Sequence, residues 1–220
     1  MLRALIFDFD GLIIDTETPI IEAYGKVHQA HGKPFDRELF RRNIGHAEYG
    51  FNPWQAFGPG AQAELLEQER RRINRELTLL QPILPGVRKT LEAAHAAGLR
   101  LGVASNSSHG WVEPHLERLG LHAFFTQFSC LGDTASPKPE PDIYRHAVNG
   151  LGLRPVEAVA LEDSSTGLKA ARRAKLWTLA VPNVSTSGHD LGDADWILTS
   201  MEDLDLAWLA AEVARGRDGR

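Results

Sequence analysis

Two carboxylates stand directly after the first apolar run of the chain. Residues 4–7 are all apolar, and Asp8 and Asp10 follow them. Side chains alternate along an extended strand, so these two carboxylates lie on the same side. Because close anions repel each other, either one of them carries a proton or a cation lies nearby. Asp10 with Gly11 would also fit an ordinary turn, and for the pair alone that interpretation stays open.

A serine–asparagine pair and a lysine, elsewhere in the chain, could interact with a phosphate group. Ser105 and Asn106 follow the apolar run 99–104, where a hydroxyl and free backbone N–H groups would suit phosphate oxygens. Lys138 lies between two prolines, which restrict the backbone and so present its side chain in a defined way. Taken alone, Ser105 and Asn106 would equally cap a helix, and Lys138 would equally be a solvated surface residue.

A second pair of acids, Glu162 and Asp163, follows the apolar run 158–161. Adjacent acids at a strand end suit a hard cation such as Mg²⁺, which takes oxygen ligands, although they too could cap a helix. Together, the four segments supply a carboxylate pair, a hydroxyl, a lysine and a second acidic pair. Phosphoryl transfer from an ester needs this combination of a nucleophile, compensating charge and Mg²⁺.

The elements that must position these residues are short and continuously apolar. Such runs are typical of strands buried on both faces of a parallel sheet. The predicted strands are 4–7, 99–104, 124–130, 158–161, 176–181 and 196–198, and helical patterns lie between them at 86–97, 111–119, 141–150, 164–174 and 204–213. This alternation predicts an α/β fold of the Rossmann type, with a doubly wound, mostly parallel sheet and right-handed crossovers. Ligands of such sheets bind at the carboxyl ends of the strands.

Residues 16–81 interrupt the alternation. They contain two helical patterns and no convincing strand, with a stretch rich in glycine, proline and aromatic residues between the helices. We therefore predict an α/β core domain of residues 1–15 and 82–220, and an inserted helical cap domain of residues 16–81. The length of 220 residues agrees with this division, because about 150 residues make one typical domain.

The composition is that of an ordinary globular protein, with 43% hydrophobic and 24% charged residues. The net charge of −5 gives no basic surplus for nucleic acid or an anionic membrane. No apolar run approaches the roughly 20 residues of a membrane span, and the single cysteine, Cys130, excludes an intramolecular disulfide. We expect a cytoplasmic monomer that binds a small phosphorylated metabolite and neither nucleic acid nor membrane.

The order of the motifs along the chain and the residues within them resemble those of the haloacid dehalogenase (HAD) superfamily. The matching stretches are Phe7–Gly11 with Asp15–Glu17, Ala104–Asn106, Pro137–Pro139 and Leu161–Gly167. The helical insertion is similar to that of the β-phosphoglucomutase-like branch, whose members are mostly small-molecule phosphatases. The resemblance implies a Mg²⁺-dependent phosphatase that hydrolyses a small phosphate monoester, such as a sugar phosphate, through an aspartyl-phosphate intermediate.

The resemblance also implies a role for each residue of the motifs. Asp8 would be the nucleophile, and Asp10 would protonate the leaving oxygen and then deprotonate the attacking water. Ser105 and the backbone N–H of Asn106 would hold the phosphoryl oxygens. Lys138 would offset the negative charge of Asp8 and of the phosphoryl group.

The metal ligands follow from the same resemblance. The Asp8 carboxylate, the Asp10 backbone carbonyl and Asp163 would hold Mg²⁺. Glu162 would either bind the metal or orient a metal-bound water, and these alternatives stay open.

The cap would select the substrate in such an enzyme. The candidate residues lie in and just after its central loop: His46, Glu48, Tyr49, Phe51 and Trp54. Each of them could instead contribute to packing between the cap helices, so both interpretations stay open.

Two other functions compete with the phosphatase. A sugar phosphate mutase of the β-phosphoglucomutase type carries an arginine in this loop and a histidine early in the cap, where this chain has Glu48 and Ile20. The arginines at 70–72 could still reach a second phosphate, although such a run on a helix is more often a solvated face. From a different class, a receiver-like signalling module would accept a phosphoryl group, but such modules are one small domain long and use a later strand.

Overall fold

A computed structural model describes residues 1–43, 50–60, 62–184, 186 and 188–216. The chain divides into two compact units. The core unit is Met1–Ile14 with Ile83–Arg220, and the helical unit is Asp15–Pro82. The boundaries expected from the sequence for the insertion, 16 and 81, lie one residue inside the helical unit.

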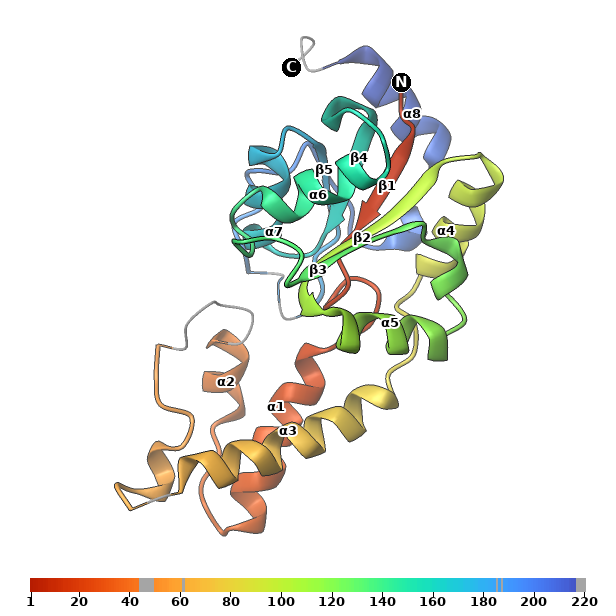
Figure 1. Ribbon diagram of the computed structural model, residues 1–220. Coiled ribbons are helices and arrows are strands. Elements are labelled where there is room, and N and C mark those ends of the chain that lie inside the picture. Colours follow the sequence, from red (N-terminus) through yellow and green to blue (C-terminus); the bar gives the residue numbers. More distant parts are fainter. Residues whose placement is uncertain (44–49, 61, 185, 187, 217–220) are drawn as a thin grey trace. The chain divides into compact units, whose positions relative to one another are not determined.

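In the described residues of the core unit, a six-stranded sheet has the order β3-β2-β1-β4-β5-β6, and every pairing is parallel (Figure 1). The strands are β1 (Ala4–Phe7), β2 (Arg100–Ser108), β3 (Gln127–Leu131), β4 (Ala158–Glu162), β5 (Trp177–Ala180) and β6 (Trp196–Ile197). The expected α/β fold with a doubly wound parallel sheet is thereby confirmed. Strand order reverses at β1 and β4, and a reversal of this kind opens a ligand crevice at the carboxyl ends of the strands.

Helices cover both faces of the sheet. They are α4 (Val87–Ala96), α5 (His109–Arg118), α6 (Asp142–Gly150), α7 (Ser165–Arg173) and α8 (Leu206–Arg215). Figure 1 shows α4, α5 and α8 on one side of the sheet and α6 and α7 on the other. Alternation along β1 sends Leu5 and Phe7 into the first of these two cores and Ala4 and Ile6 into the second.

The face covered by α6 and α7 is lined with small side chains. Ala158 and Ala160 of β4 lie in the same buried cluster as Ala170 of α7. Small residues at such a contact let a helix pack closely on the sheet. The alternation of β1 also carries Asp8 toward this face, where it meets a residue of the segment that leads into α6.

Two strand boundaries differ from the sequence prediction by more than one residue. The prediction ended the second strand at residue 104, whereas β2 continues to Ser108. Its ladder with β3 shifts register between Ala104 and Ser108, so Ser105 and Asn106 lie inside the strand at an irregular segment instead of after its end. β3 begins later than predicted because a short 3₁₀ helix, η2 (His122–Phe124), precedes it.

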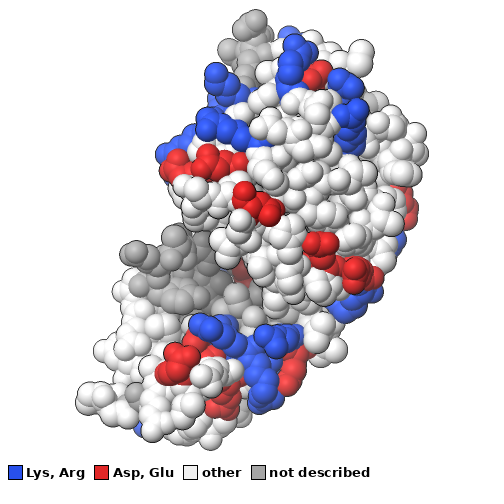
Figure 2. All heavy atoms as spheres, in the orientation of Figure 1, with Lys and Arg blue, Asp and Glu red and all other residues white. Residues whose placement is uncertain are grey.

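The helical unit contains α1 (Glu17–Ala30), α2 (Arg37–Asn43), α3 (Ala63–Leu79) and the 3₁₀ helix η1 (Gln55–Phe57). Its own core is rich in aromatic side chains; the buried members are Ile21, Tyr24, Val27, Phe40, Trp54 and Leu66. None of the helices that the structure describes combines the length and the apolar character needed to cross a membrane. Basic and acidic side chains are interspersed over the face shown in Figure 2.

The stability of the core unit can be tested at a matched pair of leucines. Leu91 of α4 is fully buried against the sheet, whereas Leu131 at the end of β3 is 54% exposed. We expect Leu91→Ala to lower the free energy of unfolding by about 2–5 kcal/mol, because it removes buried apolar surface and leaves a cavity. Leu131→Ala should change it little. Urea unfolding followed by circular dichroism measures both, and equal effects would contradict this description of the core.

Candidate active site

A buried lysine joins the two central strands at their carboxyl ends. Asp8 follows β1 and Glu162 ends β4, and the pairing of Phe7 with Leu161 brings the two carboxylates side by side. The Lys138 Nζ lies 2.6 Å from Asp8 Oδ1 and 2.6 Å from Glu162 Oε1. All three side chains are buried, so water screens these ion pairs poorly.

Lys138 reaches this position because its backbone and its side chain are both held. The Asn106 side chain accepts a hydrogen bond from the Lys138 backbone N–H at 2.8 Å and donates one to the Lys138 carbonyl at 3.3 Å. The Tyr144 ring of α6 lies under the ammonium, with its centroid 5.0 Å from Nζ. The lysine therefore cannot relax easily toward solvent.

Glu162 is fully buried and has several hydrogen-bond donors around it. In addition to Lys138, Tyr144 Oη donates to Oε1 at 2.6 Å, and Ser164 Oγ donates to Oε2 at 3.3 Å. Gly167 of α7 leaves the space for this carboxylate, because a Cβ on Gly167 would lie 1.9–2.1 Å from its atoms. The lack of a side chain at position 167 is thus a steric requirement of the site.

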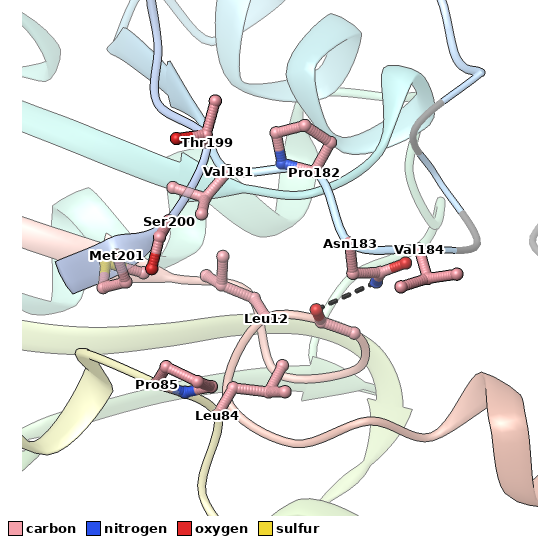
Figure 3. Close-up of a pocket in the computed structure, with 11 residues that line it drawn as sticks. Leu12, Leu84, Pro85, Val181, Pro182, Asn183, Val184, Thr199, Ser200 and Met201 are labelled. Atoms are coloured by element: carbon pink, nitrogen blue, oxygen red, sulfur yellow. Dashed lines mark hydrogen bonds between the residues drawn. The ribbon is translucent and has the colours of Figure 1, made fainter. Parts of the chain in front are cut away.

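Asp163, the next residue, is connected to the loop after β1. Asn183 Nδ2 lies 2.9 Å from Asp163 Oδ2 and 3.0 Å from the Gly11 carbonyl oxygen, and it donates to both. Figure 3 shows Asn183 near Leu12 and Val184 at one side of a cavity, with its hydrogen bond to that carbonyl dashed. Gly11 has φ +79°, and a Cβ there would meet Asp163 Oδ2 at 2.4 Å. Only glycine satisfies both the backbone angle and the close approach.

Asp10 is held separately, by donors on both of its oxygens. Trp111 Nε1 of α5 donates to Oδ1 at 3.0 Å. Ser105 Oγ and Ser107 Oγ donate to Oδ2 at 3.2 Å and 2.7 Å. The irregular segment of β2 turns both hydroxyls toward Asp10, and the Ser107 backbone N–H donates to Ser105 Oγ at 2.9 Å.

The concentration of buried charge perturbs the ionisation of Asp8. Burial, with the negative charges of Glu162 and Asp10, raises the pKa of Asp8 to about 8, although Lys138 opposes the shift. For Lys138, burial disfavours the charged form, but the carboxylates of Asp8 and Glu162 outweigh burial and raise its pKa. Asp8 and Glu162 therefore share the positive charge of one lysine.

Three acids of the site lie close enough together to bind one cation. Asp8, Glu162 and Asp163 each offer a carboxylate oxygen, and the three oxygens lie within 4.8 Å of one another. Lys138 neutralises only one of the three carboxylates. A divalent cation with a preference for oxygen ligands would supply the missing positive charge, so the residues present fit Mg²⁺.

Most of the residues predicted from the sequence lie together in the core unit. Those that converge at the carboxyl ends of the strands are Asp8, Asp10, Ser105, Lys138, Glu162 and Asp163. Asn106 is also there, but its side chain holds the backbone of Lys138. The Asp10 side chain is bound by α5 and β2 and does not belong to the group of three acids described above.

The structure describes only some of the predicted substrate-selecting residues of the cap. His46, Glu48 and Tyr49 lie outside the described residues. Trp54 is buried in the core of the helical unit, with its ring centroid 5.1 Å from that of Tyr24 and 5.6 Å from that of His28. Packing within the helical unit therefore accounts for Trp54.

Four residues of the site were not identified from the sequence: Ser107, Trp111, Tyr144 and Asn183. Asn183 follows β5 closely, so the strand-end criterion that found the acids could have found it as well. Trp111 and Tyr144 lie inside helical patterns, and nothing in those patterns shows that a polar atom turns toward the strand ends. Their roles depend on how α5 and α6 pack on the sheet.

Comparison with known proteins shows the family to which the chain is similar. A family model described as haloacid dehalogenase-like hydrolase matches residues 2–175. YhcW of Bacillus subtilis, provisionally assigned as a phosphatase, is 38% identical over 95% of this chain and 96% of its own length. The phosphorylated carbohydrates phosphatase of Thermotoga maritima is 31% identical over 90% of each chain.

Solved structures agree with the fold. The crystal structure of a Thermotoga maritima protein, provisionally assigned as a β-phosphoglucomutase, matches this chain with a TM-score of 0.82 at 27% identity. The match covers 96% of this chain and 99% of the other. The similarity therefore extends over both units and places the chain near the β-phosphoglucomutase-like branch.

The close contact at Gly167 can be tested by adding one carbon atom. Gly167→Ala should lower the free energy of unfolding by about 1–3 kcal/mol, because the new methyl group would collide with the Glu162 carboxylate. Gly110→Ala is the matched control near the start of α5, where the nearest atom would be 4.0 Å away. Urea unfolding compares the two, and a Gly167→Ala protein as stable as the control would contradict the tight packing around Glu162.

Proposed function

The chain belongs to the haloacid dehalogenase-like hydrolase family, and from this we propose that it is a Mg²⁺-dependent phosphatase. Its substrate would be a small phosphate monoester, such as a phosphorylated carbohydrate, hydrolysed through an aspartyl-phosphate on Asp8. The main support is the buried contact of Lys138 with Asp8 and Glu162 at the point where strand order reverses. The name of the Thermotoga maritima phosphatase supports the carbohydrate class.

Asp8 is the proposed nucleophile. Lys138 binds Oδ1, which orients the carboxylate and leaves Oδ2 to form the bond to phosphorus while the ester P–O bond breaks. The ammonium of Lys138 also offsets charge on the phosphoryl group during this transfer. Glu162 keeps Lys138 in position and charged, because the two form a buried ion pair.

Asp10 is the proposed acid and base. It gives a proton to the leaving oxygen as the substrate ester breaks, and the alcohol departs. It then takes a proton from the water that attacks the aspartyl-phosphate, and phosphate departs while Asp8 is restored. The hydroxyl of Ser105 lies beside Asp10, so we assign it, with the backbone N–H of Asn106, to the phosphoryl oxygens.

The proposed ligands of Mg²⁺ are the carboxylates of Asp8 and Asp163 and the backbone carbonyl of Asp10. When bound, the cation would withdraw negative charge from the phosphoryl oxygens and allow a dianionic ester to approach the acids. Glu162 accepts hydrogen bonds on both of its oxygens, which supports a role in holding Lys138 and orienting a metal-bound water. Asn183 would fix Asp163 through its side-chain amide.

The competing functions receive less support. A mutase must bind a second phosphate, and the arginines at 70–72 were the candidates for this role. Arg70, however, pairs with Glu67 at 2.7 Å and lies over the ring of Tyr24 in the helical unit. The two arginines that follow it pair with glutamates of the same helix. Membership of the hydrolase family excludes the receiver-like module. We therefore retain the phosphatase as the proposal.

The proposed reaction can be tested with p-nitrophenyl phosphate and a panel of sugar phosphates. Asp8→Asn keeps the size of the side chain but removes its charge, so turnover should fall on the order of 10³-fold or more. Asp142→Asn, on α6 and with a partly exposed side chain (38%), should retain full activity. Release of phosphate, measured with Mg²⁺ and with EDTA, checks both variants. Full activity of Asp8→Asn, or turnover that needs no metal, would reject the mechanism.

The raised pKa of Asp8 should make the binding of Mg²⁺ depend on pH. In the metal-free protein Asp8 holds a proton below about pH 8, and Mg²⁺ must displace this proton in order to bind the carboxylate. The apparent affinity for Mg²⁺ should therefore rise roughly tenfold per pH unit up to that pH and then level off. Isothermal titration calorimetry at several pH values measures it. Asp8→Asn should abolish the dependence on pH, and a constant wild-type affinity would contradict the prediction.

A further inference from the structure

The two oxygens of Asp10 are bound by donors of different chemical kinds. Oδ1 accepts from the indole N–H of Trp111, at 3.0 Å. Oδ2 accepts from the hydroxyls of Ser105 and Ser107. An indole N–H can only donate, whereas a hydroxyl can turn and accept instead. The two sides of the carboxyl group are therefore not equivalent toward a proton.

This difference decides where a proton on Asp10 can lie. A proton on Oδ1 would weaken the hydrogen bond from Trp111, because a neutral oxygen accepts less strongly than a carboxylate oxygen and the indole N–H cannot accept in return. A proton on Oδ2 would face Ser105 and Ser107, whose hydroxyls can rotate to accept it. The arrangement keeps Oδ1 as an acceptor in both protonation states and reserves Oδ2 for the proton.

The indole is held in this position by the core of the unit. Trp111 is half-buried and packs against the cluster between the sheet and α5. Its ring lies edge-on to His115, with 4.7 Å between centroids, and His115 in turn lies 6.1 Å from the ring of Phe9. Because Phe9 directly precedes Asp10, the indole and the carboxyl group are fixed by the same packing.

We propose that Trp111 is a positioning residue for Asp10, which anchors Oδ1 and directs the exchangeable proton to Oδ2. This inference rests on the proposed function, because it assumes that Asp10 protonates the leaving oxygen of an ester. Trp111 acts through Asp10 and does not touch the reacting atoms. In the protonation step, the O–H bond at Oδ2 breaks, a new O–H bond forms on the departing oxygen, and Asp10 becomes a carboxylate.

Such a role has a specific kinetic signature. An alkoxide leaves poorly unless it is protonated, whereas p-nitrophenolate is stable enough to leave without a proton. The value of kcat/KM covers only the steps up to departure of the alcohol, so it does not include the later step in which Asp10 acts as a base. A misplaced Asp10 should therefore lower kcat/KM for alkyl esters and leave that for p-nitrophenyl phosphate nearly unchanged.

The test is Trp111→Phe, which keeps an aromatic ring but removes the N–H. We expect kcat/KM for an alkyl phosphate to fall about 10- to 100-fold, the effect of losing one hydrogen bond to a charged group. The value for p-nitrophenyl phosphate should change less than about threefold, and a series of aryl phosphates should show a steeper dependence on the leaving group. Trp208→Phe, on α8 and 38% exposed, is the matched control and should behave as wild type.

A second variant removes the N–H without changing the shape of the side chain. Replacement of Trp111 by β-(3-benzothienyl)alanine puts sulfur where the N–H was, so it distinguishes the lost hydrogen bond from altered packing. It should reproduce the selective loss on alkyl esters. Asp10→Asn provides the reference, because it removes the proton donor itself and should show the same selectivity more strongly.

The outcomes separate this inference from the proposed function. If both Trp111 variants lower kcat/KM equally for all esters, or leave all values unchanged, while Asp10→Asn is selective, the positioning role is wrong and the phosphatase stands. If the wild-type protein hydrolyses no phosphate ester, or Asp8→Asn remains active, the proposed function fails and the inference falls with it.

Discussion

The contact of one buried lysine with two buried carboxylates is the interaction on which this site depends. Lys138 Nζ lies 2.6 Å from both Asp8 and Glu162, and Asp163 adds a third carboxylate within reach of the other two. Burial makes these charges costly unless they are paired. One ammonium cannot balance three carboxylates, so the site either keeps a proton on Asp8 or takes up a cation. Chemistry that needs a charged Asp8 therefore depends on the cation.

The fold brings these charges together through ordinary features of a parallel sheet. β1 and β4 are neighbours at the point where strand order reverses, so their last residues meet at one edge. Alternation along β1 directs Asp8 to the side of α6, where the Tyr144 hydroxyl binds Glu162. Gly11 and Gly167 leave room for the acids, because a Cβ at either position would collide with a carboxylate.

Much of this arrangement could be predicted from the sequence. The acids were found because their types are unusual after buried apolar runs, and the strands themselves follow from those runs. Lys138 was found because a proline on each side restricts its backbone. Trp111 and Tyr144 could not be found in this way, since a helical pattern shows which face is apolar but not which polar atom reaches a neighbouring strand. Likewise, the shift in register within β2, which turns Ser107 toward Asp10, has no signal in the local sequence.

The most direct measurement of this charge balance is the titration of the Asp8 carboxyl carbon by NMR, with the Asp8→Asn spectrum used for assignment. We predict that in the metal-free protein this carbon titrates near pH 8, and that saturating Mg²⁺ removes the titration from the neutral range. A carbon that titrates near the ordinary value of 3.8 in the metal-free protein, or one whose titration Mg²⁺ leaves unchanged, would contradict the dependence of Asp8 on a cation.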